Sequence, residues 1–156
     1  MTGGVSSSGD LGFTTGPFTP VPRVGTGSSA ASKELKGRNQ SLRDADRAFS
    51  EAARLRGPVD AARDHVRDDG RLHRNGLMPI VGREAIDRYL TERPGRFTGE
   101  GMFADVSASG DLGYTYGRYE LALKDTKKGY YVRLWTRDSG GPWKVLLEVT
   151  SPLPAS

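Results

Sequence analysis

The sequence predicts a single α+β domain at residues 41–153, preceded by a tail at residues 1–40. Three helical patterns come first, in which apolar residues recur every three or four positions. Segments that alternate apolar and polar residues then fill the second half of the chain. Because helices and strands are segregated along the sequence, we expect α+β architecture with an antiparallel sheet, and not a parallel sheet built from alternating units.

The first helix is expected to start at Ser41, where Ser41-Leu42-Arg43-Asp44 resembles a capping box with Asp in place of Glu. Gly57-Pro58 ends it and begins a second helix, since proline is favoured at the first helical position. Asp69-Gly70 closes the second helix. A third helix is predicted over Arg83–Leu90, before Pro94-Gly95.

The remaining segments are predicted to be strands. Two short ones flank Asn75-Gly76, a dipeptide typical of a tight hairpin turn. Longer strands are separated by turns rich in Gly, Asp and Lys. The expected ranges are 70–74, 77–81, 96–107, 112–123, 129–137 and 143–149.

An internal repeat links the tail to the domain. Residues 5–18 read VSSSGDLGFTTGPF and residues 106–119 read VSASGDLGYTYGRY, identical at nine of fourteen positions with a constant offset of 101. Since the offset is close to one domain length, we interpret residues 5–18 as a remnant of a duplicated domain. Residues 19–40, rich in Gly, Ser and Pro, have the composition of a flexible linker. The alternative is an extra strand that docks on a sheet edge, the position to which Pro17 would restrict it.

The composition argues against several classes of protein. The net charge is +4, but acidic and basic residues are interleaved, as in Asp46-Arg47, which is typical of a solvated surface. We therefore expect no nucleic-acid partner. The chain has no cysteine, and hence no disulfide or thiolate metal site. It has neither an apolar run that could cross a bilayer nor a recognisable signal peptide, so we expect no membrane partner and, by default, a cytoplasmic location.

Several motifs together resemble the nuclear transport factor 2-like (NTF2-like) superfamily, and within it a SnoaL-like branch of unknown function. They are DADRAF at 44–49, DDGRLH at 68–73, VGREAI at 81–86, VSASGDLGYTYG at 106–117, GYYVRLW at 129–135 and WKVL at 143–146. The resemblance implies a cystatin-like cone, in which a curved antiparallel sheet wraps against three N-terminal helices. It also implies a pocket inside the cone and a two-fold dimer. It says little about function, because this fold hosts enzymes, binding modules and assembly domains.

The resemblance also bears on catalysis. Ketosteroid isomerase-like members place a catalytic carboxylate shortly after an Asp-Asp pair, and that position falls at about Arg74 here. An arginine stays protonated and cannot abstract a proton. His73 beside it is a weak candidate base, and the alternative is a structural histidine at a hairpin end. His65 and His73 are the only histidines, so we expect no metal site.

Alternate residues of the long strands should line the pocket. Candidate ligand-binding residues are Tyr116, Arg118, Glu120, Arg133, Trp135 and Glu148. The charged members could instead form cross-strand pairs on the outer sheet face, and sequence alone does not fix the register. We expect Phe49 and Ala53 to close the cone and its mouth to lie near Asp68–Arg74 and the strand ends.

We therefore expect a non-catalytic module that binds a small apolar ligand or pairs with a second copy through the outer face of its sheet. No phosphate loop, nucleophile elbow or dinucleotide motif is present, and no cofactor is expected. The alternative is a small SnoaL-like or ketosteroid isomerase-like enzyme that acts on an apolar substrate, with His73 or a pocket carboxylate as base.

Overall fold

A computed structural model describes residues 2–5, 12–15 and 29–154, and the side chains of the last range from residue 36 onwards. In chain order the elements are β1 (Thr2–Val5), β2 (Gly12–Thr15), α1 (Ser29–Arg56), α2 (Pro58–His65), β3 (Val66–His73), β4 (Ile80–Val81), α3 (Arg83–Glu92), β5 (Arg96–Val106), β6 (Leu112–Ala122), β7 (Thr126–Thr136) and β8 (Lys144–Pro152). The α+β prediction and the count of three helices are confirmed for these residues.

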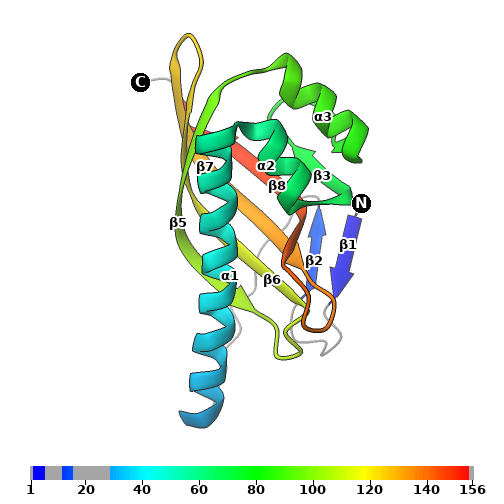
Figure 1. Cartoon of the computed structure of the whole chain (residues 1–156), viewed down its shortest axis with the longest axis vertical. Helices are drawn as coiled ribbons and strands as arrows, with labels where there is room; N and C mark the ends of the chain where they lie inside the picture. The colour runs from blue at the N-terminus through cyan, green and yellow to red at the C-terminus, as the bar shows by residue number, and fades with distance from the viewer. Residues whose placement is uncertain (1, 6–11, 16–28, 155–156) are drawn as a thin grey trace.

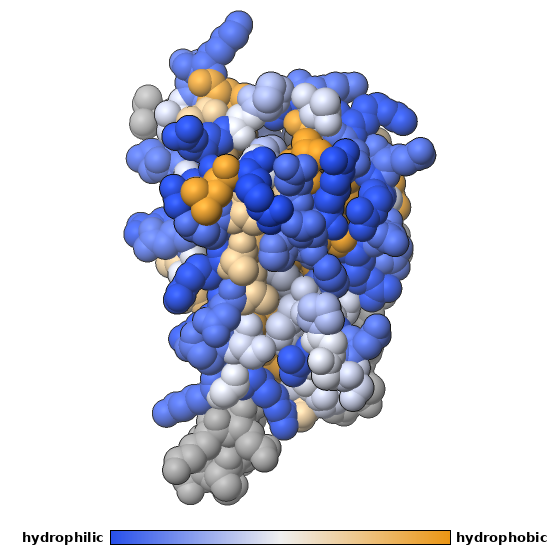
Figure 2. All heavy atoms as spheres, viewed as in Figure 1, coloured by the Kyte–Doolittle hydropathy of each residue, from blue (hydrophilic) through white to orange (hydrophobic). Residues whose placement is uncertain are grey.

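The six strands β3 to β8 form one curved sheet in the order β4-β3-β8-β7-β6-β5. Four of its five pairings are antiparallel, whereas β3 runs parallel to β8, so the sheet is mixed and not wholly antiparallel. Helix α1 lies across the inner face, and α2 and α3 cover one end (Figure 1). The exposed side of this helical layer is mainly hydrophilic, with apolar side chains confined to small patches (Figure 2).

Several boundaries differ from the sequence prediction. Helix α1 begins at Ser29 and not at Ser41, because Ala, Leu, Lys and Glu in residues 29–40 favour helix despite Gly37. Helix α2 stops at His65, and Val66 opens β3, where its pairing with Val145 overrides the helical spacing. Strand β4 is only Ile80–Val81. Residues 29–40 of the predicted linker at residues 19–40 therefore lie in α1, and residues 19–28 lie outside the described residues.

Contacts from the start of α1 reach the turn between β5 and β6. Arg38 donates to the carbonyl of Ala108, and the Asn39 Oδ1 accepts from the Val106 amide at 3.0 Å. Trp143, in the turn before β8, donates its indole N–H to the Ser41 hydroxyl at 3.2 Å. These bonds fix the direction in which α1 crosses the sheet.

Glycines in β6 allow α1 and the neighbouring strands to approach closely. A Cβ on Gly113 would lie 2.6 Å from the Cδ2 of Leu42, and one on Gly117 would lie 2.6 Å from the Tyr131 hydroxyl. Leu42, Phe49 and Ala53 of α1 are therefore buried against the sheet, where Trp135 and Val145 are fully buried. The core lies between α1 and the inner sheet face.

Two β-bulges shape that inner face. Met102 has no partner in the β5–β6 ladder, and Leu146 has none in the β7–β8 ladder. A bulge bends its strand and changes which side chains face inward. As a result Val145 and Glu148, an odd number of positions apart, are both buried on the inner face.

The N-terminal repeat pairs in the same register as its counterpart in the domain. Strands β1 and β2 place Val5 opposite Gly12, and β5 and β6 place Val106 opposite Gly113, the same positions shifted by the repeat offset. The loop at residues 6–11 lies outside the described residues. The shared register is what a duplication would produce, and the duplication itself stays a prediction.

None of the described helices is both long enough and apolar enough to cross a membrane.

Candidate functional site

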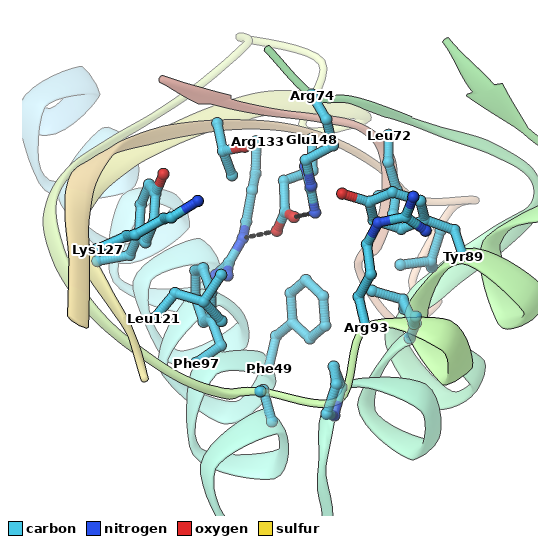
Figure 3. A pocket seen from close by; sticks show the side chains of 18 of the residues that line it. Phe49, Leu72, Arg74, Tyr89, Arg93, Phe97, Leu121, Lys127, Arg133 and Glu148 are labelled. Atoms are coloured by element: carbon cyan, nitrogen blue, oxygen red, sulfur yellow. Dashed lines mark hydrogen bonds and ion pairs between the residues drawn. The ribbon is translucent and has the colours of Figure 1, made fainter. Parts of the chain in front are cut away.

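A cavity of about 380 Å³ opens between the inner face of the sheet and the three helices. Its wall is mostly apolar, and five charged side chains reach it (Figure 3). The lining includes Phe49, Ala53, Leu72, Arg74, Arg93, Phe97, Leu121, Lys127, Arg133, Glu148 and Thr150. A volume of this size falls in the range of small-molecule sites.

The mouth of the cavity lies between the end of α3 and the β6–β7 turn, where Arg93, Leu123 and Lys127 are exposed. The mouth was expected near Asp68–Arg74 and the strand ends. Leu72, Arg74 and the facing ends of β6 and β7 do line the cavity, whereas Asp68 does not. Asp68 belongs to a separate surface hollow, because β3 pairs with β8 and carries Asp68 to the other end of the sheet. Phe49 and Ala53 line the cavity.

Arg133 is the centre of a buried polar network that forms part of the cavity wall. Its guanidinium donates to Asp46 at 2.8 Å, to Glu148 at 2.8 Å and to the Ser50 hydroxyl at 3.0 Å. The side chain is only 1% exposed, so each of these bonds is made away from water. Buried charge is tolerated only where it is paired and hydrogen-bonded, a condition that this network meets.

The carboxylate of Asp46 joins α1 to two strands. It accepts from the Tyr131 hydroxyl at 2.6 Å and from the Thr115 hydroxyl at 2.9 Å, in addition to Arg133. Thr115 in turn accepts from the Trp135 indole at 2.9 Å. Burial raises the pKa of Tyr131, so the phenol remains a hydrogen-bond donor across the physiological range.

Glu148 is the carboxylate that reaches the cavity. It accepts from Arg133 on one oxygen and from Arg74, at 2.6 Å, on the other (Figure 3). Burial acts to raise the pKa of Glu148, but Arg74 and Arg133 outweigh it and hold that pKa below its usual value. The group is therefore ionised and engaged on both oxygens, which makes it a weak proton acceptor.

Aromatic rings enclose the Arg133 guanidinium. Its central carbon lies 4.3 Å from the Phe49 ring centroid and 4.2 Å from that of Tyr131. Such cation–π contacts stabilise a cation that is already desolvated. The arrangement holds Arg133 rigidly, so only one side of it is presented to the cavity.

The structure separates the six candidate ligand-binding residues into two groups. Arg133 and Glu148 line the cavity, and Trp135 is buried behind it against Phe49. Tyr116, Arg118 and Glu120 lie on the outer sheet face and do not line the cavity. Arg118 pairs with Glu100 at 2.8 Å and Glu120 with Lys128 at 3.2 Å, so for these two the cross-strand alternative holds.

His73 also faces away from the cavity. Its neighbours Leu72 and Arg74 both line the cavity, and alternation along β3 turns His73 to the opposite side. Its Nε2 is buried and has no hydrogen-bond partner among the described residues. Burial, with Arg71 and Arg74 adding to it, lowers the pKa of His73. A base on this face could not reach a molecule in the cone.

Sequence reasoning missed Asp46, which it assigned to a solvated surface. Asp46 is 3% exposed and anchors the network. The available signal was its place in the apolar stripe of α1, since Leu42, Asp46 and Phe49 follow helical spacing. Arg74 was noted only as standing in place of a catalytic carboxylate. Its ion pair with Glu148 could not be predicted, because it depends on the register between β3 and β8. Among the described residues, no group of three or more His, Cys, Asp or Glu could hold a metal ion.

No protein-family model matches the sequence, and no curated protein matches it. Solved structures do resemble this chain. A ketosteroid isomerase-like protein from Erwinia carotovora atroseptica aligns with a TM-score of 0.66 and 18% identity, covering 76% of this chain and 98% of its own. An NTF-2 like protein of unknown function from Shewanella oneidensis aligns with a TM-score of 0.58 and 21% identity, covering 72% and 97%. An NTF2-like protein with a cystatin-like fold from Novosphingobium aromaticivorans aligns with a TM-score of 0.57 and 18% identity, covering 81% and 89%.

The chain has the NTF2-like fold. The resemblance inferred from the sequence motifs is thus confirmed at the level of the fold, cystatin-like cone included. Identities near one in five carry no information on activity, and a shared fold does not imply a shared reaction. What this NTF2-like domain does must be argued from its own cavity.

Proposed function

We propose that this NTF2-like domain binds a small, mostly apolar molecule in its cone and does not transform it. The observation that carries the proposal is the cavity of about 380 Å³, which has an apolar wall and whose single carboxylate is held by two guanidiniums. Apolar cavities with a few fixed polar groups are the usual form of small-molecule sites. The nearby histidine faces the other side of the sheet.

The absence of an available base supports binding over catalysis. Glu148 lines the cavity, but its lowered pKa and its two arginine partners oppose protonation. In the isomerase resemblance a carboxylate would stand at the position of Arg74. Here that position holds an arginine, which forms an ion pair with Glu148. Proton abstraction would need Glu148 to leave both partners and remain desolvated, and each of these steps is costly.

Filling the cavity tests the proposal. Ala53 lines the cavity on α1, while Ala48 of the same helix is exposed. We expect wild type to bind 1-decanol, a neutral apolar probe, in isothermal titration calorimetry. Ala53→Trp should abolish this binding and Ala48→Trp should preserve it, with circular dichroism showing that both variants fold. Wild type that fails to bind decanol, or Ala53→Trp that binds it normally, would contradict the proposal.

A second role, self-association, is supported by the outer face of the sheet. Large apolar side chains remain exposed there, namely Phe103, Tyr116, Tyr130 and Val132, at 38% to 49%. Phe103 stacks on Tyr116 with ring centroids 5.3 Å apart, so the surface is contiguous across β5 and β6. Exposed apolar patches on a sheet often mark interfaces. Sedimentation at roughly 100 µM should show a dimer that Val132→Glu dissociates, and a monomeric wild type would count against this role.

A further inference from the structure

The buried charges in and next to the cavity wall balance one another. Arg74 and Arg133 carry the positive charges, and Asp46 and Glu148 carry the negative ones. Every one of these groups has a partner within 2.8 Å. The interior of the cone therefore offers a bound molecule no free charge, and an apolar body fits it best.

The charge at the mouth of the cavity is not balanced in this way. Lys127 of β7 and Arg93, just beyond α3, approach the cavity from opposite walls (Figure 3). The Lys127 ammonium group makes no hydrogen bond or ion pair with any residue that the structure describes. Arg93 lies over the Tyr89 ring at 4.3 Å and has only a loose contact of 3.5 Å with Glu92, which is itself 61% exposed.

A shallow hollow beside the mouth extends this positive region. It shares Arg93, Gly95 and Leu123 with the cavity and adds Arg96 and Lys124 to its rim. The acidic groups nearby are Glu92 and Asp125, so cations outnumber carboxylates at this end of the cone. A mouth of one sign attracts ligands of the opposite sign.

The apolar wall and the positive mouth select the same kind of molecule. Resting on the proposed binding function, we infer that the ligand is an amphipathic anion, whose alkyl or aryl body fills the cone while its carboxylate lies between Lys127 and Arg93. The carboxylate is the end that remains near water, which avoids the cost of burying it. An aliphatic body of this kind meets Leu72, Leu121 and Phe97.

Three probes of one chain length isolate the charge. Decanoate, 1-decanol and decylammonium share an apolar body and differ only at the head. A charge-assisted hydrogen bond contributes more than a neutral one, so decanoate should bind wild type about tenfold more tightly than decanol. Decylammonium should bind more weakly than either. The decanoate preference should shrink as salt is raised, because the mouth is solvated.

Variants at the mouth locate the preference. Lys127→Met and Arg93→Met keep the aliphatic stems and remove the charges, and together they should reduce the decanoate-to-decanol ratio to about one. The matched control is Lys128→Met. Lys128 is the next residue on β7, is exposed and is paired with Glu120, so this change should leave the ratio unaltered. Titration calorimetry measures all of these affinities on the full chain.

The outcomes separate this inference from the proposed function. Decanol binding without a decanoate preference would overturn the anionic ligand and leave cavity binding standing. A preference that survives in the Lys127→Met, Arg93→Met double variant would overturn the assignment to the mouth. Failure of decanol to bind would overturn the proposed function itself.

Discussion

Removing the Asp46 carboxylate should destabilise the fold far more than any surface change on the same helix. Asp46→Ala deprives Arg133, Tyr131 and Thr115 of an acceptor at once. It leaves Arg133, which is 1% exposed, with Glu148 as its single buried counter-charge, shared with Arg74. Breaking a buried pair from one side costs about 3–5 kcal/mol. For a domain of this size that loss lowers the melting temperature by roughly 10–20 °C.

Asp44→Ala is the matched control for this experiment. Asp44 is exposed two residues earlier on α1 and accepts only from Gln40, at 2.9 Å. Its loss should cost at most about 0.5 kcal/mol, as for most surface substitutions. Urea denaturation followed by circular dichroism gives both free energies of unfolding, provided that the slopes agree.

A double-mutant cycle sharpens the result. Arg133→Met removes the cation that links Asp46 to Glu148, and combined with Asp46→Ala it removes both partners of one pair. If the two residues stabilise the fold through each other, the double variant should be more stable than the sum of the single losses predicts, by at least about 1 kcal/mol. An Asp46→Ala loss within about 1 kcal/mol of the Asp44→Ala loss, or simple additivity in the cycle, would refute the role given to the network.

Three further predictions concern pH, the tail and catalysis. Burial lowers the pKa of His65 and of His73, so the unfolded chain binds protons more readily than the folded chain. The free energy of unfolding should therefore be greatest above about pH 6.5 and fall as the pH drops below it. The double variant His65→Gln, His73→Gln should flatten this pH dependence in denaturant titrations. Glu148, whose pKa is lowered, contributes stability that is present above about pH 4.5 and lost as pH falls further. A chain shortened to begin at Asn39 should melt within roughly 5 °C of the full chain, because the Asn39 and Ser41 contacts are kept. A collapse of stability would show that residues 1–38 dock on the domain. No isomerisation of a 3-oxo-Δ5 steroid should be measurable. His73→Ala should change decanol affinity by less than about tenfold. Robust steroid turnover by the wild type that is lost in His73→Ala would overturn the binding role.

The elements that the sequence predicted well are those in which local signals agree with the tertiary fold. Strands β5 and β6 lie on either side of the Ser109-Gly110-Asp111 turn. Both start at the predicted residue, and both end one residue earlier than predicted. Helix α3 starts at Arg83 as expected. Strand β3 was mistaken at its start because Ala62 and Val66 share helical spacing, and only pairing with the distant β8 makes Val66 a strand residue.

The candidate site depended on side-chain direction, which alternation alone did not give. Arg133 and Glu148 were found as charged strand residues, but whether Glu148 faced the same side as Arg133 depended on the bulge at Leu146, which no local signal marks. Lys127 was missed because β7 begins at Thr126 and not at Gly129. Asp46 was missed because a charged residue in a helix is usually exposed, and its burial needs partners from β6 and β7.

Backbone amide spectra titrated with 1-decanol test the central claim, binding inside the cone, most directly. The residues that line the cavity, such as Ala53, Leu72, Leu121 and Thr150, should shift progressively and reach saturation. Tyr116 and Tyr130, exposed on the outer face of the same sheet, should remain unchanged. Saturating shifts confined to the cavity lining would bear out the account, whereas shifts confined to the outer face, or none at all, would contradict it.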